Sequence, residues 1–325
     1  MSVQCPSAVV LIRPHHFCPN PATAADNAFQ SIDPTRSAEQ IAAAAFEEST
    51  RLAETLEAAG IQVLMFEDTE NVRPDSVFPN NWFSTHPGGR IALYPMFSPS
   101  RRSERRPDVI DALKARFRVQ DIIDFSGLEY DNIFLEGTGA MVLDHTNRVA
   151  YAAKSHRADP LALERFCATF GYEPMMFAAS DPSGTPIYHT NVMMCIATDV
   201  ALVGLSLIED PARRAEVAER LTEPGRELIE LSAEQVTEFA GNAIELRSPA
   251  GRILVMSGRA EASLTPEQRA TIERSCRIVG VEIPTIELAG GSVRCMIAGI
   301  HLDRRPVVPA VAPVADPPVE AVAFA

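Results

Sequence analysis

Residues 132–139 read NIFLEGTG, a β-rich run that ends in a glutamate beside small turn residues. Four other segments also place a polar or reactive residue beside β-type residues: VFPNNW (77–82), PIYHTN (186–191), FAGNAIEL (239–246) and GSVRCMIA (291–298). Similar segments at intervals along a chain indicate one supersecondary unit used several times. We therefore expect a fold built from repeats.

The repeat has a nearly constant period. Glu136, His189, Asn242 and Cys295 follow one another at intervals of 53 residues, and Asn81 precedes Glu136 by 55. A period of this size is typical of stacked or radially arranged units. If each unit places the same point on a central axis, these residues converge, and five units close into a propeller-like ring. The alternative is coincidence, because the chain contains many polar residues.

Five segments carry helix start signals. Ser37 and Gln40 form a predicted capping box, and Gly60 ends the helix that it opens. The other four helices begin with a proline in the first turn, where its missing N–H costs nothing; these prolines are Pro107, Pro160, Pro211 and Pro266. Asp159, Asp210 and Thr265 precede the last three as N-caps. With strand-like pairs between the helices, the pattern predicts an α/β or α+β fold with a repeated unit.

Composition excludes several classes of function. The chain has 325 residues, 46% of them hydrophobic, and a net charge of −14. Such an acidic chain argues against nucleic acid or an anionic membrane as partner. No apolar run approaches the roughly 18 residues of a membrane helix, and residues 1–16 do not resemble a signal peptide. The six cysteines lack CxxC pairs, which disfavours a zinc site or a disulfide framework and makes a reducing cytoplasm the expected compartment.

The end of the chain differs in composition from the rest. Residues 304–325 read RRPVVPAVAPVADPPVEAVAFA. Proline at this density disfavours both helices and central strands. We expect a catalytic domain over residues 1–303, followed by a tail over 304–325.

Cys295 is the candidate nucleophile. It follows the glycine pair Gly290-Gly291 and lies next to Arg294. A free thiol is mostly protonated at neutral pH, and an adjacent cation favours the reactive thiolate. The alternative is a buried structural cysteine, because cysteine is among the most buried residue types. Its position in phase with His189 and Glu136 favours the nucleophile.

His189 and Glu136 are the candidate acid/base pair. Histidine titrates near neutral pH and can protonate a departing amine. Glu136 can orient that histidine or accept hydrogen bonds from substrate nitrogens. The alternatives are a histidine that caps a loop and a solvated glutamate beside a glycine turn. His145 and His301 are weaker candidates, because neither falls in phase.

Several motifs together resemble the strand motifs of the pentein superfamily, which contains arginine deiminases, dimethylarginine hydrolases and amidinotransferases. These motifs are RPDSVFPNNW (73–82), FLEGTG (134–139), IYHTN (187–191) and GGSVRCM (290–296). PSRRSE (99–104) resembles the arginine-bearing loop of dimethylarginine hydrolases, and KSHR (154–157) resembles their SxRT-type strand. The resemblance runs from about Val9 to Leu302. It implies a single-domain α/β fold, a pseudo-fivefold ββαβ propeller with five blades.

The resemblance also implies roles for individual residues. Cys295 matches the nucleophile, His189 the general acid/base and Glu136 the catalytic carboxylate. No metal or organic cofactor is implied.

Further residues match the substrate-binding positions of these families. Asp75 matches a substrate-binding carboxylate, and Arg101 or Arg102, with Arg157, matches the arginines that hold the substrate's own carboxylate. The planar arginine fork suits that task. Asn242, in phase with the catalytic positions, is also expected at the substrate.

Two positions depart from the guanidinium-binding members. Asn81 and Asn191 stand where those members carry aspartates. An asparagine has no charge but offers an acceptor and donors, which suits a neutral ureido group better than a guanidinium. The sequence motifs PNNW (79–82) and EGTG (136–139) resemble those of a branch associated with citrulline utilisation. The alternative is that the asparagines only stabilise tight turns.

The sequence thus predicts a cysteine hydrolase that cleaves a C–N bond of a citrulline- or arginine-derived side chain through a covalent thio-intermediate. Arginine deiminase, dimethylarginine hydrolase, dihydrolase and amidinotransferase remain rivals, because a fold alone does not decide function. A non-catalytic pentein-like binding protein, such as a ribosome anti-association factor, is disfavoured by the presence of the Cys, His and carboxylate. The expected partner is a small amino acid, with neither nucleic acid nor membrane; a homodimer is left open.

Overall fold

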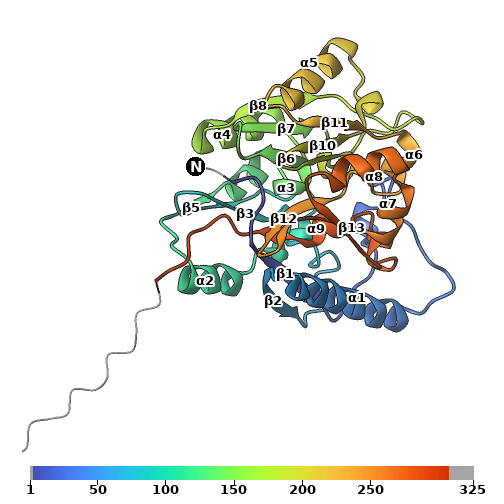
Figure 1. Ribbon diagram of the computed structural model, residues 1–325. Helices are drawn as coiled ribbons and strands as arrows, with labels where there is room; N and C mark the ends of the chain where they lie inside the picture. Colours follow the sequence, from blue (N-terminus) through green and yellow to red (C-terminus); the bar gives the residue numbers. More distant parts are fainter. Residues whose placement is uncertain (1–2, 307–325) are drawn as a thin grey trace, which may run out of the picture.

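The computed structural model describes residues 3–306 and consists of five three-stranded sheets arranged as a ring (Figure 1). Four of the sheets share one chain order. Their first two strands form an antiparallel hairpin, and the third strand returns parallel to the second after a helix. This is the ββαβ unit that the repeat and the pentein resemblance predicted, and the prediction is confirmed.

The four units follow one another along the chain. They are β3 (Phe83–His86), β4 (Arg90–Leu93), α2 (Pro107–Arg116) and β5 (Asp121–Asp124); β6 (Met141–Asp144), β7 (Val149–Ala153), α4 (Pro160–Phe170) and β8 (Glu173–Phe177); β9 (Met194–Ile196), β10 (Val200–Val203), α5 (Pro211–Thr222) and β11 (Glu227–Glu230); and β12 (Ile244–Ser248), β13 (Gly251–Ser257), α7 (Gly258–Ser263), α8 (Pro266–Glu273) and β14 (Arg277–Val281).

The fifth sheet joins the two ends of the described chain. β15 (Ala298–Gly299) pairs antiparallel with β1 (Ala8–Pro14), and β1 pairs parallel with β2 (Gln62–Asp68) after α1 (Ala38–Ala58). The last strand therefore supplies the inner hairpin partner that the first unit lacks. Because this pairing closes the ring, the blades depend on contacts between residues almost 300 positions apart.

The helix start signals act as predicted. The Ser37 side chain accepts a hydrogen bond from the backbone N–H of Gln40, whose side chain bonds back to the cap, and Gly60 follows α1 with φ of +85°. At α4, the Asp159 side chain caps Leu161. Each of the five predicted helices forms, and Figure 1 shows α1, α2, α4, α5 and α8 around the periphery, with α3 (Gly137–Ala140) and α9 (Val293–Met296) near the centre.

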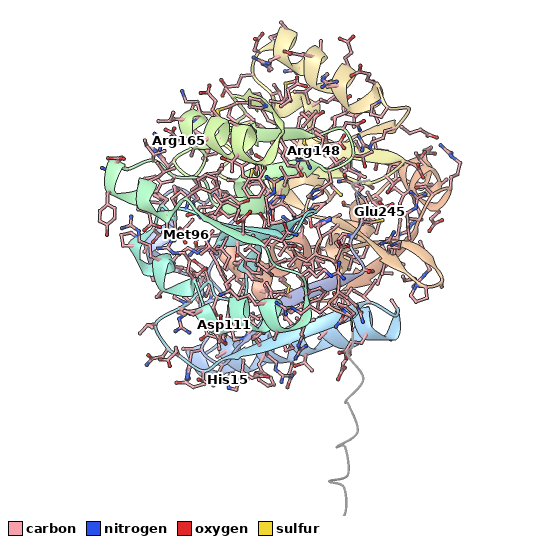
Figure 2. All side chains as sticks on the ribbon, turned by 90° about the vertical axis from the view of Figure 1, so that its left-hand side faces the viewer. His15, Met96, Asp111, Arg148, Arg165 and Glu245 are labelled. Atoms are coloured by element: carbon pink, nitrogen blue, oxygen red, sulfur yellow. The ribbon has the colours of Figure 1, made fainter. Side chains whose placement is uncertain are left out.

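The inside of the ring is closely packed. All five residues of β7 are buried, as are all four of β6, and side chains fill the space between the sheets (Figure 2). The remaining elements are short: α6 (Ala233–Thr237), η1 (Pro21–Thr23), η2 (Pro79–Asn81), η3 (Pro99–Glu104), η4 (Ser126–Asp131), η5 (Thr190–Val192), η6 (Leu205–Leu207) and η7 (Ile286–Ala289). Among residues 3–306, no helix has both the length and the apolar character needed to span a bilayer.

The predicted tail falls mostly outside the described residues, because the description ends at Pro306. At its start, Arg304 forms an isolated bridge with Phe117, and the backbone N–H of Arg305 donates to the carbonyl of Arg116 at 3.0 Å. The domain boundary at residue 303 stays a prediction.

A cluster of histidines lies inside the ring. The rings of His145 and His301 have centroids 4.1 Å apart, and His86 packs 6.3 Å from His145. Burial lowers the pKa of all three: to about 4 for His301 and well below the usual value for the other two. These side chains are therefore neutral in the folded protein at pH 7.

This cluster predicts acid sensitivity. Between pH 6.5 and about 4 the unfolded chain binds protons at these histidines and the folded protein does not, so the free energy of unfolding falls as the pH is lowered. With a folded-state pKa of about 4, His301 by itself lowers the free energy of unfolding by about 2 kcal/mol at pH 5, and His86 and His145 act in the same direction. Burial raises the pKa of some carboxyl groups, those of Glu48, Glu104 (to about 7) and Glu287. These groups change stability in the opposite direction, because the folded protein holds their protons more tightly than the unfolded chain.

Urea midpoints measured at pH 7, 6 and 5 test this prediction, with His301→Gln as the variant that should flatten the pH dependence. A midpoint that stays constant from pH 7 to pH 5 contradicts it.

Candidate active site

The five in-phase residues meet at the centre of the ring, in the short turns that lead into the first strand of each blade. Asn81 ends η2, Glu136 precedes α3, His189 precedes η5, Asn242 lies two residues before β12, and Cys295 lies in α9. The sequence pattern placed these residues at strand ends. The short helical turns that carry these residues were not predicted, because a single helical turn is too short to show a periodic pattern in the sequence.

Cys295 lies under a cradle of two asparagines. Its Sγ accepts hydrogen bonds at 3.2 Å from Nδ2 of Asn191 and at 3.2 Å from Nδ2 of Asn242. Oδ1 of Asn242 accepts from the backbone N–H groups of Arg294 and Cys295. The side chain of Asn242 thus holds both the sulfur and the turn that carries it.

His189 is oriented by Glu136. Nε2 of His189 lies 2.9 Å from Oε2 of Glu136, and both side chains are buried. Burial alone would raise the pKa of Glu136, but the guanidinium groups of Arg157 and Arg101 and the bond from His189 hold it well below its usual range. Because the carboxylate accepts from Nε2, the other ring nitrogen, Nδ1, is left as a base. Burial lowers the pKa of His189 to about 4, despite the carboxylate.

Two buried arginines surround the same carboxylate. Nη1 of Arg101 and Nη1 of Arg157 each lie 3.5 Å from Oε2 of Glu136. Arg101 also donates to both carboxylate oxygens of Glu104, at 2.9 and 2.8 Å, and lies 3.5 Å from Asp75. The charges at the centre therefore form a connected network.

The residues that line the site cavity come from several blades and from one N-terminal loop. They are Thr23, Asn27, Asp75, Phe78, Asn81, Arg101, Arg157, Tyr188, His189, Ala289, Gly291 and Cys295. The cavity encloses about 10 Å³, room for about one water molecule. An amino acid enters only if part of this wall moves.

Residues 20–30 form one side of the cavity, to which they contribute Thr23 and Asn27. Asn20 donates to Asp75 at 2.8 Å, Asn27 donates to the carbonyl of Ala289 at 3.1 Å, and Asp26 accepts two hydrogen bonds from Arg157, at 2.9 and 2.8 Å. We call residues 20–30 the covering loop. Its carboxylate occupies the fork of an arginine that was predicted to hold the substrate's carboxylate.

Most of the predicted site residues are brought together. Asp75, Asn81, Arg101 and Arg157 line the cavity, as do His189 and Cys295, while Glu136 and Asn191 lie directly behind them.

Two predicted site residues lie elsewhere. Arg102 donates to the carbonyl of Met96 and pairs with Glu129 at 3.2 Å, away from the cavity. Asn242 donates to the sulfur and is not part of the cavity wall, so the substrate contact predicted for it stays a prediction.

The sequence analysis missed the covering loop, Glu104 and Tyr188. The Tyr188 ring lies 4.6 Å from that of His189, and its hydroxyl donates to the carbonyl of Gly290. A tyrosine directly before the in-phase histidine was the available signal. The covering loop had none beyond its Asn and Pro content.

Comparison with known families agrees with this geometry. The family described as N,N dimethylarginine dimethylhydrolase, eukaryotic, matches residues 13–302. The chain belongs to this family. The protein is thus a hydrolase of carbon–nitrogen bonds, and the pentein resemblance is confirmed. The search of curated protein sequences found no match.

Several solved structures are similar in fold to this chain. The N-terminal domain of ArgZ, an arginine dihydrolase from cyanobacteria, superposes with a TM-score of 0.69 at 15% identity, covering 91% of this chain and 98% of the other. Unliganded AgrE superposes with a TM-score of 0.70 at 16% identity, covering 93% of this chain and 40% of the AgrE chain. The adduct of a dimethylarginine dimethylaminohydrolase with S-methyl-L-thiocitrulline superposes with a TM-score of 0.59 at 13% identity, covering 92% of this chain and 100% of the other. At these identities the likeness concerns the fold.

The covering loop predicts restricted access to Cys295 in this hydrolase. Asp26→Asn removes the charge that holds the loop on Arg157, so open states become more populated. Alkylation of Cys295 by iodoacetamide should accelerate about tenfold, the factor for ~1.4 kcal/mol of lost closed-state stability. Asp33→Asn is the matched control, because Asp33 bonds to Thr35 and Arg36 outside the cavity wall. Equal rates in the two variants would show that the loop does not limit access.

The cradle predicts a second effect on the same reaction. Asn242→Ala removes an N–H donor from the sulfur and the acceptor that holds the α9 turn, so the thiolate is less stabilised. Alkylation should slow by about tenfold at neutral pH, since a hydrogen bond to a charged group contributes about 1.5–3 kcal/mol. Asn147→Ala, in the turn between β6 and β7, is the control, and melting temperatures verify folding. An unchanged alkylation rate in a folded Asn242→Ala protein would show that Asn242 does not stabilise the reactive form of Cys295.

Proposed function

We propose that the protein hydrolyses a C–N bond in the ureido group of a citrulline-like amino acid, with Cys295 as nucleophile. The observation that supports this substrate is a pair of unpartnered amide atoms at the centre: Asn81 lines the cavity together with Cys295, and Asn191 donates to the sulfur. Among the described residues, Nδ2 of Asn81 and Oδ1 of Asn191 are buried and have no hydrogen-bond partner. One is a donor and the other an acceptor, as a ureido group with its C=O and NH₂ requires.

The neighbours of each amide support this orientation. Oδ1 of Asn81 accepts from Nη2 of Arg101 at 3.1 Å, and an arginine only donates, so the free atom of Asn81 is the NH₂ donor. Nδ2 of Asn191 donates to the sulfur, which leaves Oδ1 free. A guanidinium has no acceptor, so it would leave the donor of Asn81 unpaired at a cost of about 1–3 kcal/mol.

The charges at the centre admit either substrate. Arg101 pairs with Glu104, Asp75 and Glu136, and Arg157 pairs with Glu136. Two guanidinium groups thus face three carboxyl groups, so a cationic substrate would not be left without a counter-charge. The preference for a neutral ureido group therefore rests on the two unpartnered amide atoms.

The proposed chemistry uses the residues in fixed roles. The sulfur of Cys295 attacks the ureido carbon, and the thiol proton passes to Nδ1 of His189, the base left free by Glu136. His189 then protonates the leaving nitrogen as the C–N bond breaks and a thiocarbamate forms on Cys295. His189 next takes a proton from water, whose oxygen attacks the thiocarbamate; the C–S bond breaks, and the proton on His189 returns to the sulfur of Cys295. The released carbamic acid decomposes to CO₂ and ammonia, so one water is consumed per citrulline.

The rest of the cavity wall suits the backbone of an amino acid. We assign the substrate carboxylate to Arg157, whose fork Asp26 occupies in the closed form, and a substrate nitrogen to Asp75 on the opposite wall. Arg101 is tied to Glu104, so Arg157 is the stronger candidate of the two arginines. We further propose residues 1–303 as the catalytic domain and the cytoplasm as its compartment, since all six cysteines are free.

The second candidate is arginine dihydrolase activity. ArgZ carries that name, and AgrE was solved in complex with L-arginine. The carboxylate of Asp75 on the cavity wall is the feature of this chain that favours a cationic side chain.

Steady-state kinetics with citrulline and arginine decide between the two candidates. We expect wild type to have the higher kcat/KM for citrulline and Asn81→Asp to move the citrulline-to-arginine ratio toward arginine by about tenfold or more, because it replaces the free donor with an acceptor. Asn191 is left unchanged, because an aspartate there would place a charge against the sulfur.

Two measurements complete the experiment. Cys295→Ala should abolish turnover with an unchanged melting temperature, while Cys195→Ala, in β9, should retain it. A wild-type enzyme that turns over arginine efficiently and ignores citrulline contradicts the ureido assignment and supports the dihydrolase.

A further inference from the structure

A second cavity lies on the ring axis, lined by the first strands of all five blades: β3, β6, β9, β12 and β15. It encloses about 60 Å³, enough for a few water molecules or one small ion. No residue lines both this axial cavity and the site cavity. Consecutive residues of α9 separate them, because Cys295 faces the site cavity and Arg294 the axial cavity.

Arg294 is the charged group of this cavity without a counter-charge. Its guanidinium donates to the carbonyl of Ile297 at 3.0 Å, and within residues 3–306 no carboxylate lies within ion-pair distance of it. The buried arginines Arg101, Arg157 and Arg226 each pair with carboxylates. Burial lowers the pKa of Arg294, although not enough to make an arginine neutral. Most of its N–H donors are therefore free to bind an anion.

The rest of the wall adds donors and one acceptor. His145 bonds through Nδ1 to the hydroxyl of Tyr172 at 2.9 Å, so Nε2 is free, and the ring of His301 packs against that of His145 in a tilted arrangement. Glu245, labelled in Figure 2, is the carboxylate of the wall. One of its oxygens accepts from Thr198, while Oε1 is buried, accepts no hydrogen bond among the described residues and lies 3.6 Å from Nε of Arg252. The wall thus offers a cationic fork and a carboxylate oxygen that still lacks a hydrogen bond.

We propose that the axial cavity binds bicarbonate. Two of the ion's oxygens face the fork of Arg294, the geometry in which guanidinium groups bind oxyanions, and its O–H donates to Oε1 of Glu245. The ion is small and planar, as a cavity of this volume requires. The choice of bicarbonate rests in part on the proposed function, since hydration of the CO₂ released from a ureido carbon produces it.

The bound ion lowers the reactivity of Cys295. The charged and titratable groups around the sulfur are Asp75, Arg101, Arg157, Tyr188 and His189, which line the site cavity with it, and Arg294 on the axial side. An anion on Arg294 cancels a positive charge near the sulfur and so makes the sulfur less reactive toward electrophiles. The backbone link is short, because Oδ1 of Asn242 accepts from both Arg294 and Cys295. The product of the proposed reaction thereby inhibits the nucleophile from the opposite face of the ring.

The test measures alkylation of Cys295 by iodoacetamide at pH 8 in bicarbonate, nitrate or gluconate at constant ionic strength. Bicarbonate should slow alkylation saturably, by about threefold or more, and raise the melting temperature. Nitrate, which has the same shape but no O–H, should act only at higher concentration. Gluconate, which is too large for the cavity, should have no effect.

Three variants locate the effect. Arg294→Gln should abolish the response, Glu245→Gln should remove the preference for bicarbonate over nitrate, and Arg157→Gln, on the site side, should retain the response. If Arg294→Gln does not fold, His301→Gln, which should raise the bicarbonate concentration needed, replaces it.

Two outcomes overturn the proposal: equal alkylation rates in bicarbonate and gluconate, or a response that Arg157→Gln abolishes and Arg294→Gln retains. The measurement needs no turnover. A protein that responds to bicarbonate but does not hydrolyse citrulline would contradict the proposed function and leave the axial site standing.

Discussion

The buried carboxylate of Glu136 is the group on which the centre of this protein depends. It is fully buried and lies within 3.5 Å of Arg101, Arg157 and His189, while its other oxygen accepts from the backbone N–H of Phe97. These partners come from different connections around the ring. Without the carboxylate, two cations would remain buried with less compensation, a loss of about 3–5 kcal/mol for a broken buried pair. The same charge balance that holds the blades together therefore fixes the ring of the histidine.

The close approach of the blades depends on a glycine. A Cβ at Gly139 would meet Nδ2 of Asn81 at 2.2 Å and Nδ1 of His189 at 2.8 Å, which is nearer than such atoms approach. The EGTG motif thus lets residues from three neighbouring turns share one point. A larger residue there would push apart the donor that we assign to the ureido oxygen and the base that we assign to proton transfer.

The centre also contains buried polar atoms without hydrogen-bond partners, which a ligand could satisfy. Buried amide atoms without partners are uncommon in folded proteins, because each costs free energy, yet Asn81 and Asn191 both carry one here. Oε1 of Glu245 and the free donors of Arg294 form a second such set on the axial side. Such groups are tolerated where the surrounding structure is rigid, and a ligand that satisfies them gains the free energy that the fold has given up. The ring provides this rigidity, because its last strand is paired with its first.

The repeat, the five helices with their start signals and the set of central residues could all be predicted from the sequence alone; the side chains of the predicted caps bond as expected in α1, α4, α5 and α8. Helix caps, prolines and a 53-residue spacing are local or periodic features, so they can be recognised in the amino-acid sequence. The resemblance added Asp75, Arg101 and Arg157, which the fold brings to the cavity. Other features depend on pairs of residues far apart in the chain: the choice of Arg101 over Arg102, the use of Asn191 and Asn242 to hold the sulfur, and the covering loop with Asp26 on Arg157. Charge pairing and hydrogen-bond direction are set by which groups meet after the ring closes. These pairings are visible in the three-dimensional structure alone, because a local sequence pattern does not specify which distant residue a buried polar group will contact.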